Sequence, residues 1–150
     1  DIIINNAGIK TDEFLNDLNF SDIEQQFKVN AIGPLKVTQS LMDNLVSGSK
    51  VALISTRMGS IGDNTSGGFY GYRMSKTALN SLGKTLAQDL KPKNISVAML
   101  HPGFVKTDMV NHDGEVTAEY AALGLTQRIE ELTLTNTGSF WHANGEQLPW

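Results

Sequence analysis

Two apolar runs, Val51-Ala52-Leu53-Ile54 and Ile95-Ser96-Val97-Ala98-Met99-Leu100, enclose a segment of helical period and decide the fold. Both runs are short and rich in aliphatic and β-branched residues, as is typical of strands buried on both faces. Residues 70–90 between them carry one leucine every three or four positions, which predicts a helix. The stripe consists of Leu79, Leu82, Leu86 and Leu90. Strand, helix and strand in this order predict a right-handed βαβ unit with parallel strands.

The same alternation continues on both sides of this unit. Ile2 to Ile4 and Ser139 to His142 are two further short apolar runs. A helix is expected from Ser21, where Ser21 and Glu24 have capping-box spacing, to about Val46 with an interruption. Another is expected from about Thr117 to Leu132. Alternating strands and helices without a linker or repeat predict a single α/β domain with a parallel sheet between helices.

Composition narrows the function classes. The chain has 150 residues, of which 40% are hydrophobic and 19% charged, as is ordinary for a globular domain. Its net charge of -4 argues against nucleic acid or an anionic membrane as the main partner. The absence of cysteine excludes disulfides and thiolate chemistry, and the histidines lack metal-ligand spacing. No signal peptide or spanning segment is recognisable, and we expect a cytoplasmic protein.

The pair Tyr72 and Lys76 opens the helix predicted over residues 70–90. Four residues make about one helical turn, so both side chains project from one face. A phenol titrates near pH 10, and an adjacent ammonium favours the phenolate and lowers that pKa. The pair therefore indicates an acid/base group for chemistry at a carbonyl or an alcohol, although a surface tyrosine and lysine at this spacing are also common.

Asn30 lies four residues before Pro34 within the first predicted helix. Proline lacks the N–H that would bond to the Asn30 carbonyl, and its ring crowds that carbonyl. The helix should bend here and leave the Asn30 carbonyl free. A proline kink without a catalytic role is the alternative interpretation.

Further motifs stand at the ends of the predicted strands. In chain order the set is Asn5-Asn6-Ala7-Gly8, Asn30, Ile54-Ser55-Thr56-Arg57-Met58-Gly59, the Tyr72/Lys76 pair and Pro102-Gly103. This ordered set spans nearly the whole chain and resembles the short-chain dehydrogenase/reductase family. The branch of the C-factor and sniffer-type carbonyl reductases is indicated by Gly59-Ser60-Ile61, Asp63-Asn64, Gly67-Gly68 and Tyr72-Arg73. The resemblance implies a Rossmann-type doubly wound parallel sheet in a three-layer αβα arrangement.

The resemblance also implies catalytic roles. Tyr72 would be the acid in carbonyl reduction and the base in alcohol oxidation, and Lys76 would lower its pKa and hold the nicotinamide ribose. Thr56 stands where the family has a serine that orients the substrate carbonyl, with Ser55 and Ser60 as alternatives and a loop-stabilising hydroxyl as the plain structural interpretation. The Asn30 carbonyl would hold a water that extends a proton relay.

For the cofactor, the resemblance implies NADP, with NAD not excluded. Besides Lys76, the residues expected to contact it are Asn5, Ala7 and Gly8 on the adenosine side and Pro102, Gly103, Val105 and Thr107 near the nicotinamide. The segment from Phe104 to Val116 would cover the substrate as a lid.

One part of the family pattern is missing. No GxxxGxG motif, which receives the pyrophosphate at a helix N-terminus, occurs in this chain. We therefore expect residues 1–150 to form one partial Rossmann-like domain, the catalytic half of such an enzyme without its first three strands and glycine-rich loop. Its opening strand should expose an apolar edge at Ile2, Ile3 and Ile4, a template for pairing with another chain.

These observations predict an NAD(P)-dependent oxidoreductase acting on a small carbonyl or alcohol. The alternative is a catalytically incomplete fragment that serves as an interaction or assembly module, and a third possibility is that a second chain completes the sheet and the site. A homo-oligomer is expected through the helix over residues 70–90 or through the edge strand at Ile2–Ile4. The leucine stripe of that helix would be either core or a dimer face.

Overall fold

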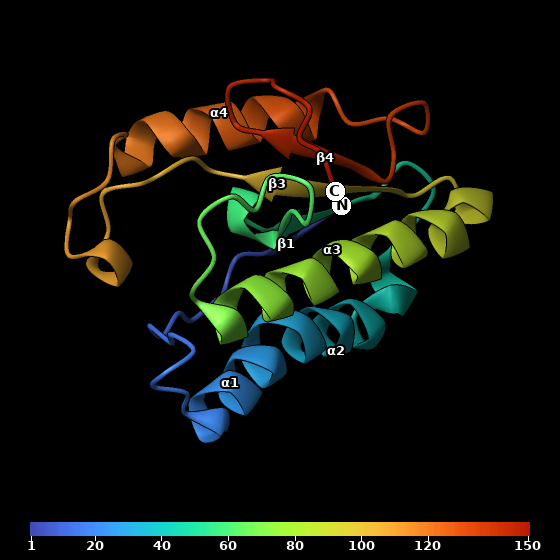
Figure 1. The fold of residues 1–150 in the computed structure, drawn as a ribbon. Coiled ribbons are helices and arrows are strands. Elements are labelled where there is room, and N and C mark those ends of the chain that lie inside the picture. Colours follow the sequence, from blue (N-terminus) through green and yellow to red (C-terminus); the bar gives the residue numbers. More distant parts are fainter.

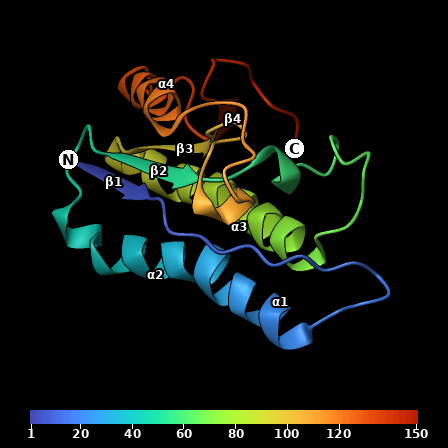
Figure 2. The same cartoon turned by 90° about the vertical axis from the view of Figure 1, so that its left-hand side faces the viewer.

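A computed structural model describes residues 1–150 as a four-stranded sheet between two layers of helices. The strands are β1 (Ile2–Asn5), β2 (Lys50–Ile54), β3 (Ser96–His101) and β4 (Ser139–His142). The helices are α1 (Phe20–Phe27), α2 (Gly33–Ser40), α3 (Tyr70–Leu90) and α4 (Ala118–Glu130). Figures 1 and 2 show α1, α2 and α3 on one face of the sheet and α4 on the other. The predicted three-layer α/β fold is confirmed.

All neighbouring strands are parallel, and the sheet order is β1-β2-β3-β4. Successive side chains of a strand point to opposite faces, so the two central strands supply two separate cores. Val51, Leu53, Val97 and Met99 face α3, whereas Ala52, Ile54, Ala98 and Leu100 face α4. Every residue of β3 is buried, as its nearly continuous apolar sequence predicted.

The helix predicted from Ser21 to about Val46 is divided in the structure. The α1 helix begins at Phe20 and has Asn19 as its N-cap, whose side chain accepts from Ser21 N and Asp22 N. The predicted capping box with Ser21 as the N-cap is therefore wrong, because the cap lies two residues earlier. A π-helical turn over Lys28–Ile32 separates α1 from α2. Pro34 follows that turn and cannot donate to the Asn30 carbonyl, which explains the predicted interruption.

The α3 helix packs against both the sheet and α1 with very little space. A Cβ on Gly83 would lie 2.1 Å from Met99 Sδ, and one on Gly71 would lie 2.3 Å from Gln26 Nε2. Leu79, Leu86 and Leu90 are buried in the core below the sheet, so the leucine stripe is core and not a dimer face.

The opening strand β1 is an edge strand, as predicted, but only part of it is exposed. Ile2 and Ile4 are about half exposed, whereas Ile3 is buried at 9%. The reason is the alternation of the strand: Ile3 faces the layer of α2 and α3, and the opposite face of β1 has no covering helix. None of the helices combines the length and the apolar character needed to cross a membrane.

Candidate active site

Tyr72 and Lys76 lie in the first two turns of α3, close to the carboxyl end of β2. Both side chains are buried, with 8% and 4% of their surface exposed. Lys76 Nζ donates to the Ile54 carbonyl at 2.8 Å and lies 5.9 Å from the centroid of the Tyr72 ring. The one-turn spacing therefore brings the two groups together under the end of the sheet, where ligands of open α/β sheets bind.

The pKa of Tyr72 differs from the expectation. Burial raises the pKa of Tyr72 to about 12, and a hydrogen-bonding interaction with the Thr56 side chain offsets only part of this effect. The net pKa of Tyr72 is therefore raised, whereas the Tyr72/Lys76 pair predicted a lowered one. Removing a phenolate from water costs more than the Thr56 hydrogen bond returns, and the Lys76 ammonium is directed at the Ile54 carbonyl.

Lys76 itself is strongly affected by its surroundings. Burial lowers the pKa of Lys76 to about 8, because the charged ammonium loses its hydration. Its three N–H donors make a single hydrogen bond, the one to Ile54 O. A Cβ on Gly8 would lie 3.3 Å from Lys76 Nζ, so the glycine leaves the ammonium open on the side of the loop after β1.

Thr56 is the hydroxyl that the sequence analysis placed at the position of the family's serine. It follows β2 in extended conformation and caps a 3-10 turn over Arg57–Gly59, with its Oγ1 accepting from Met58 N at 3.3 Å. The two alternatives are occupied elsewhere: the Ser55 hydroxyl donates to Asn80 Oδ1 at 2.6 Å, and the Ser60 hydroxyl accepts from Asp63 N. Of the three hydroxyls, that of Thr56 is the one whose hydrogen bonding lowers the pKa of Tyr72.

Asn30 is fully buried in the π-helical turn, and its side chain binds the loop after β1. Its Oδ1 accepts from Ile9 N at 2.8 Å, and its Nδ2 donates to Ile9 O at 2.8 Å and to Ser75 Oγ at 3.0 Å. Ser75 Oγ in turn donates to the Tyr72 carbonyl at 2.9 Å. Sequence reasoning missed this link through Ser75, although the residue stands inside the Tyr72–Lys76 motif.

The residues expected on the adenosine side lie along the end of β1 and the loop after it. Asn5 is buried and its Nδ2 donates to Thr38 Oγ1 of α2 at 3.3 Å, so its side chain ties the sheet to a helix. Ala7 is exposed and Gly8 is half-buried. The loop thus presents its backbone, not large side chains, beside Lys76.

The residues expected near the nicotinamide leave the sheet at the end of β3. Gly103 has φ of +92°, a conformation that favours glycine, and its N–H faces His101 Nδ1 at 3.4 Å. Pro102 and Val105 are half-buried, whereas Thr107 is exposed and its hydroxyl donates only to the Val105 carbonyl. Unlike Tyr72 and Lys76, Thr107 is therefore exposed, and its side chain forms no hydrogen bond with either of them.

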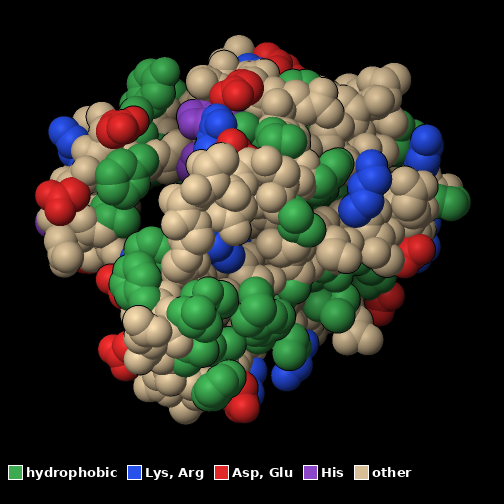
Figure 3. All heavy atoms as spheres, viewed as in Figure 1, with side chains coloured by type: hydrophobic (Ala, Val, Ile, Leu, Met, Phe, Trp, Pro, Cys, Tyr) green, Lys and Arg blue, Asp and Glu red, His purple; other side chains and the backbone are tan.

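Residues 104–116 form the segment predicted as a lid. Its two ends are joined by backbone bonds from Lys106 N to Val116 O and from Val116 N to Phe104 O. Phe104 and Met109 expose nearly half of their side chains. Figure 3 shows a gap between the part of the molecule at the left and the body, with histidine side chains at its upper end.

A histidine pair at the base of this segment was not predicted. The rings of His101 and His142 meet edge to face with centroids 4.7 Å apart at the ends of β3 and β4. Burial, His142 and Arg57 together lower the pKa of His101 to about 3, and burial and Arg57 also lower the pKa of His142. Both rings are thus neutral near pH 7. Their positions at strand ends were the only signal in the sequence.

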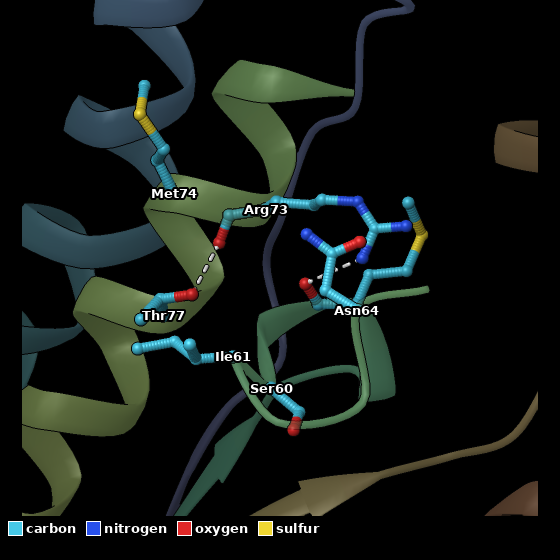
Figure 4. Close-up of a pocket in the computed structure, with 7 residues that line it drawn as sticks. Ser60, Ile61, Asn64, Arg73, Met74 and Thr77 are labelled. Atoms are coloured by element: carbon cyan, nitrogen blue, oxygen red, sulfur yellow. Dashed lines mark hydrogen bonds between the residues drawn. The ribbon is translucent and has the colours of Figure 1, made fainter. Parts of the chain in front are cut away.

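A separate pocket of about 340 Å³ opens beside the candidate site. Figure 4 shows Arg73 and Thr77 on α3 facing Ile61 and Asn64 of the loop that precedes the helix. Arg73 holds this loop by donating to Gly67 O and Gly68 O. The lining contains Met58, Ser60, Ile61, Asn64, Arg73, Met74 and Thr77. Tyr72, Lys76 and Thr56 are not among these residues.

Comparisons with known proteins agree with this geometry. Residues 1–117 match the family described as short chain dehydrogenase. The chain is 39% identical to "C-signal" of Myxococcus xanthus over 100% of its own length and 92% of that protein. It superposes on the carbonyl reductase Sniffer of D. melanogaster with a TM-score of 0.93 at 29% identity, covering 99% of this chain and 66% of the other. For an NADPH-bound carbonyl reductase from chicken fatty liver these values are 0.90 and 28%, with 98% and 64% covered.

The chain belongs to the short-chain dehydrogenase family, an oxidoreductase family with a Rossmann-like fold. The predicted family and its sniffer-type branch are confirmed. The chain spans about two thirds of the length of the two carbonyl reductases. The catalytic roles of the individual residues stay predictions.

Proposed function

We propose that this chain forms the catalytic half of an NADP-dependent carbonyl reductase, in which Tyr72 exchanges a proton with the substrate oxygen. One observation carries the proposal: a phenol and an ammonium are both buried at the carboxyl end of β2, and the ammonium uses one of its three donors. A buried charge with unused donors is costly unless a ligand completes its hydrogen bonds.

Tyr72 is suited to act as the acid. With a pKa raised to about 12, its phenol is protonated at neutral pH and can donate to a carbonyl oxygen as negative charge develops there. An alkoxide is a stronger base than a phenolate, so this proton transfer is favourable. In carbonyl reduction Tyr72 would thus donate this proton, and in the reverse reaction, alcohol oxidation, its phenolate would accept it.

Thr56 and Lys76 assist this step in different ways. The Thr56 hydroxyl interacts with Tyr72 and would share the substrate oxygen with it, which positions the carbonyl and stabilises the developing charge. The free donors of Lys76 suit the ribose hydroxyls, and its positive charge favours the phenolate that remains after proton transfer. Asn30 would extend the proton relay through its backbone carbonyl, which Pro34 leaves without an α-helical partner.

The residues present fit the nicotinamide end of the cofactor. Lys76, the Gly8 backbone and the Pro102-Gly103 turn would contact it at the end of the sheet, together with Val105 in the loop after β3. Asn5, the last residue of β1, and Ala7, which precedes Gly8, would lie on its adenosine side. When bound, the nicotinamide supplies the hydride. The chicken carbonyl reductase is bound to NADPH, which supports NADP as the cofactor. The GxxxGxG motif for the pyrophosphate does not occur in these 150 residues.

A fluorescence titration with NADPH, repeated with NADH, tests this proposal. We expect saturable binding that is lost in Lys76→Met and retained in Lys84→Met. Lys84 is a matched control because it lies two turns farther along the same helix and donates to Gly138 O at 3.2 Å. A folded chain that binds neither nucleotide, or equal losses in both variants, would contradict the proposal for this chain.

A second candidate function is an interaction or assembly module without catalysis. It is favoured by the length match with "C-signal", 92% of which this chain covers, and by the exposed Ile2 and Ile4 on an unpaired edge strand. A second chain that pairs with β1 could also complete the cofactor site. Either assembly would be a homo-oligomer through β1, or through the exposed Met74 side of α3.

The oligomeric state decides between these possibilities. Sedimentation of the chain over a range of concentrations should show association that Ile4→Lys abolishes, because a charge on the edge opposes pairing. Lys36→Glu on exposed α2 serves as a charge-change control. A concentration-independent monomer that binds NADPH would exclude both assembly hypotheses.

A further inference from the structure

Glu13 is a carboxyl side chain buried to 2% exposure at the start of α3. It takes part in none of the ion pairs of the chain. Burying a carboxyl group without a cation is costly unless hydrogen bonds compensate. Hydrogen bonds to the neighbouring residues provide this compensation for Glu13.

The Glu13 carboxyl group joins three parts of the chain. Its Oε1 accepts from Gln26 Nε2 at 2.7 Å and from the Thr11 hydroxyl, and its Oε2 accepts from Gly71 N at 3.3 Å. The Glu13 backbone carbonyl also accepts from Phe69 N at 2.7 Å. One residue of the loop after β1 therefore binds both α1 and the first residues of α3.

The bond to Gly71 replaces a cap that α3 lacks. The first N–H groups of a helix have no partner within the helix, and an N-cap side chain normally accepts from one of them. Phe69 occupies the cap position with φ of +54° and offers no such side chain. Glu13 supplies the acceptor from another segment, where a negative group also interacts favourably with the helix dipole.

The orientation of Gln26 is fixed, so it cannot adapt if the carboxyl group changes. Its Oε1 accepts from Thr11 N at 3.2 Å, which leaves its Nε2 facing Glu13 and Thr11 Oγ1. Gln26 is fully buried, and a Cβ on Gly71 would reach within 2.3 Å of its Nε2. The side chain is thus enclosed between α3 and the loop.

This network leads directly to the candidate site. Tyr72 follows Gly71, the residue whose N–H Glu13 binds. At the other end of the same loop, Asn30 binds both backbone groups of Ile9, next to Gly8 and Lys76 Nζ. The loop from Gly8 to Glu13 is therefore held at one end by the turn that carries Asn30 and at the other by the turn that carries Tyr72.

We propose that Glu13 is a positioning residue that fixes the first turn of α3, and with it the Tyr72 phenol, relative to the loop after β1. The functional meaning of this inference rests on the proposed role of Tyr72 as the acid. Its structural content does not, because the position and burial of Tyr72 can be measured without cofactor or turnover.

The chain has only three tyrosines, which makes Tyr72 observable by itself. In a Tyr70→Phe/Tyr120→Phe background, ¹³C labelling of the tyrosine ring reports the titration of Tyr72 by NMR. Glu13→Gln keeps the size of the side chain but directs an amide N–H₂ at donors, so one bond to Gly71 or Gln26 must fail. We expect the Tyr72 midpoint to move from about 12 toward 10 as the phenol becomes hydrated. Amide hydrogen exchange of Gly71 and Tyr72 should become at least about tenfold faster.

Two controls separate positioning from general destabilisation. Glu24→Gln makes the same chemical change at an exposed site of α1. Ile129→Val loosens the buried layer under α4, on the opposite face of the sheet. Neither control should move the Tyr72 midpoint or speed exchange at Gly71.

The proposal is overturned if folded Glu13→Gln leaves the midpoint and the exchange unchanged, or if either control reproduces its effects. Should Glu13→Gln fail to fold, Thr11→Val decides, since it removes one donor to the carboxyl group and retains the charge. Faster exchange at Gly71 in that variant supports the proposal, and unchanged exchange contradicts it.

Discussion

The first turn of α3 and the segment from Phe104 to Val116 flank the same end of the sheet and are held in opposite ways. The turn that carries Tyr72 is bonded to other parts of the chain by Glu13, and by Asn30 through Ser75. The Phe104–Val116 segment is bonded mainly to itself, through Lys106 N to Val116 O and Glu115 N to Phe104 O. One wall of the site is part of the core, and the other is a closed loop on the surface.

Under the proposed function, the two segments would have different roles. A group that must donate a proton to one point in space gains from fixed surroundings, because its geometry is set before the substrate binds. A cover that must admit and release the substrate gains from being independent of the core. The predictions below test whether the two walls respond differently to matched changes.

The largest difference is expected in catalysis. Tyr72→Phe removes the proton donor and should reduce kcat by about 100-fold or more, with little change in NADPH affinity. Phe104→Ala in the lid should mainly raise KM, because it removes apolar cover and no reacting group. The measurement is steady-state kinetics on a carbonyl substrate with NADPH. Unchanged kcat in Tyr72→Phe would remove Tyr72 from the mechanism.

One glycine in each segment, Gly71 in α3 and Gly114 in the lid, allows the stability of the two segments to be compared. A Cβ on Gly71 would lie 2.3 Å from Gln26 Nε2 and 3.1 Å from Ile23 Cα, and one on Gly114 would lie 2.3 Å from Lys106 N. Gly71→Ala should lower the free energy of unfolding by about 2–3 kcal/mol, since it forces α1 away from α3. Gly114→Ala clashes with the backbone of Val105 and Lys106, so it should open the Phe104–Val116 segment and speed proteolysis there, with a smaller loss in the free energy of global unfolding than Gly71→Ala. Urea unfolding and limited proteolysis provide the readouts, and equal losses of stability would show that the lid is part of the core.

His101, at the end of β3 where the Phe104–Val116 segment begins, should make the free energy of unfolding depend on pH. The pKa of His101 is lowered from 6.5 to about 3, so between these values the unfolded chain binds a proton that the folded chain does not. Stability should therefore fall as the pH is lowered through this window, by at most about 1.4 kcal/mol per pH unit from this group. His101→Asn should reduce that slope, as followed by urea unfolding at several pH values. His112→Asn, in the exposed part of the lid, should not change it, and a slope that survives His101→Asn would assign the effect to other groups.

The smallest effect is expected at the tip of the lid. Met109 exposes 43% of its surface, so Met109→Ala should change the free energy of unfolding by less than about 0.5 kcal/mol. If the lid covers the substrate, KM for an apolar carbonyl compound should still rise a few fold. A large loss of stability would mean that the tip packs against the body.

The elements were predictable because their signals are local. The apolar runs at Val51–Ile54 and Ile95–Leu100 became the buried central strands, and the leucine period over residues 70–90 became α3. The interruption near Pro34 was also predictable, since a missing N–H acts within one helical turn. The exact start of α1 was not, because Asn19 and Ser21 both fit a cap and only the path of the chain selects between them.

The sequence predicted which residues form the candidate site, and their functional roles stay predictions. It did not predict their pKa values or their long-range hydrogen bonds. The sequence by itself determined the one-turn spacing of Tyr72 and Lys76, the helix break after Asn30 and the order of strand ends, because these follow from backbone periodicity and from residues near one another in the chain. Only the tertiary structure decided that burial raises the pKa of Tyr72 to about 12, and that a carboxyl group 58 positions away from Gly71 caps its helix. Desolvation and long-range hydrogen bonds depend on which distant segments exclude water together, and no local pattern in the sequence encodes that.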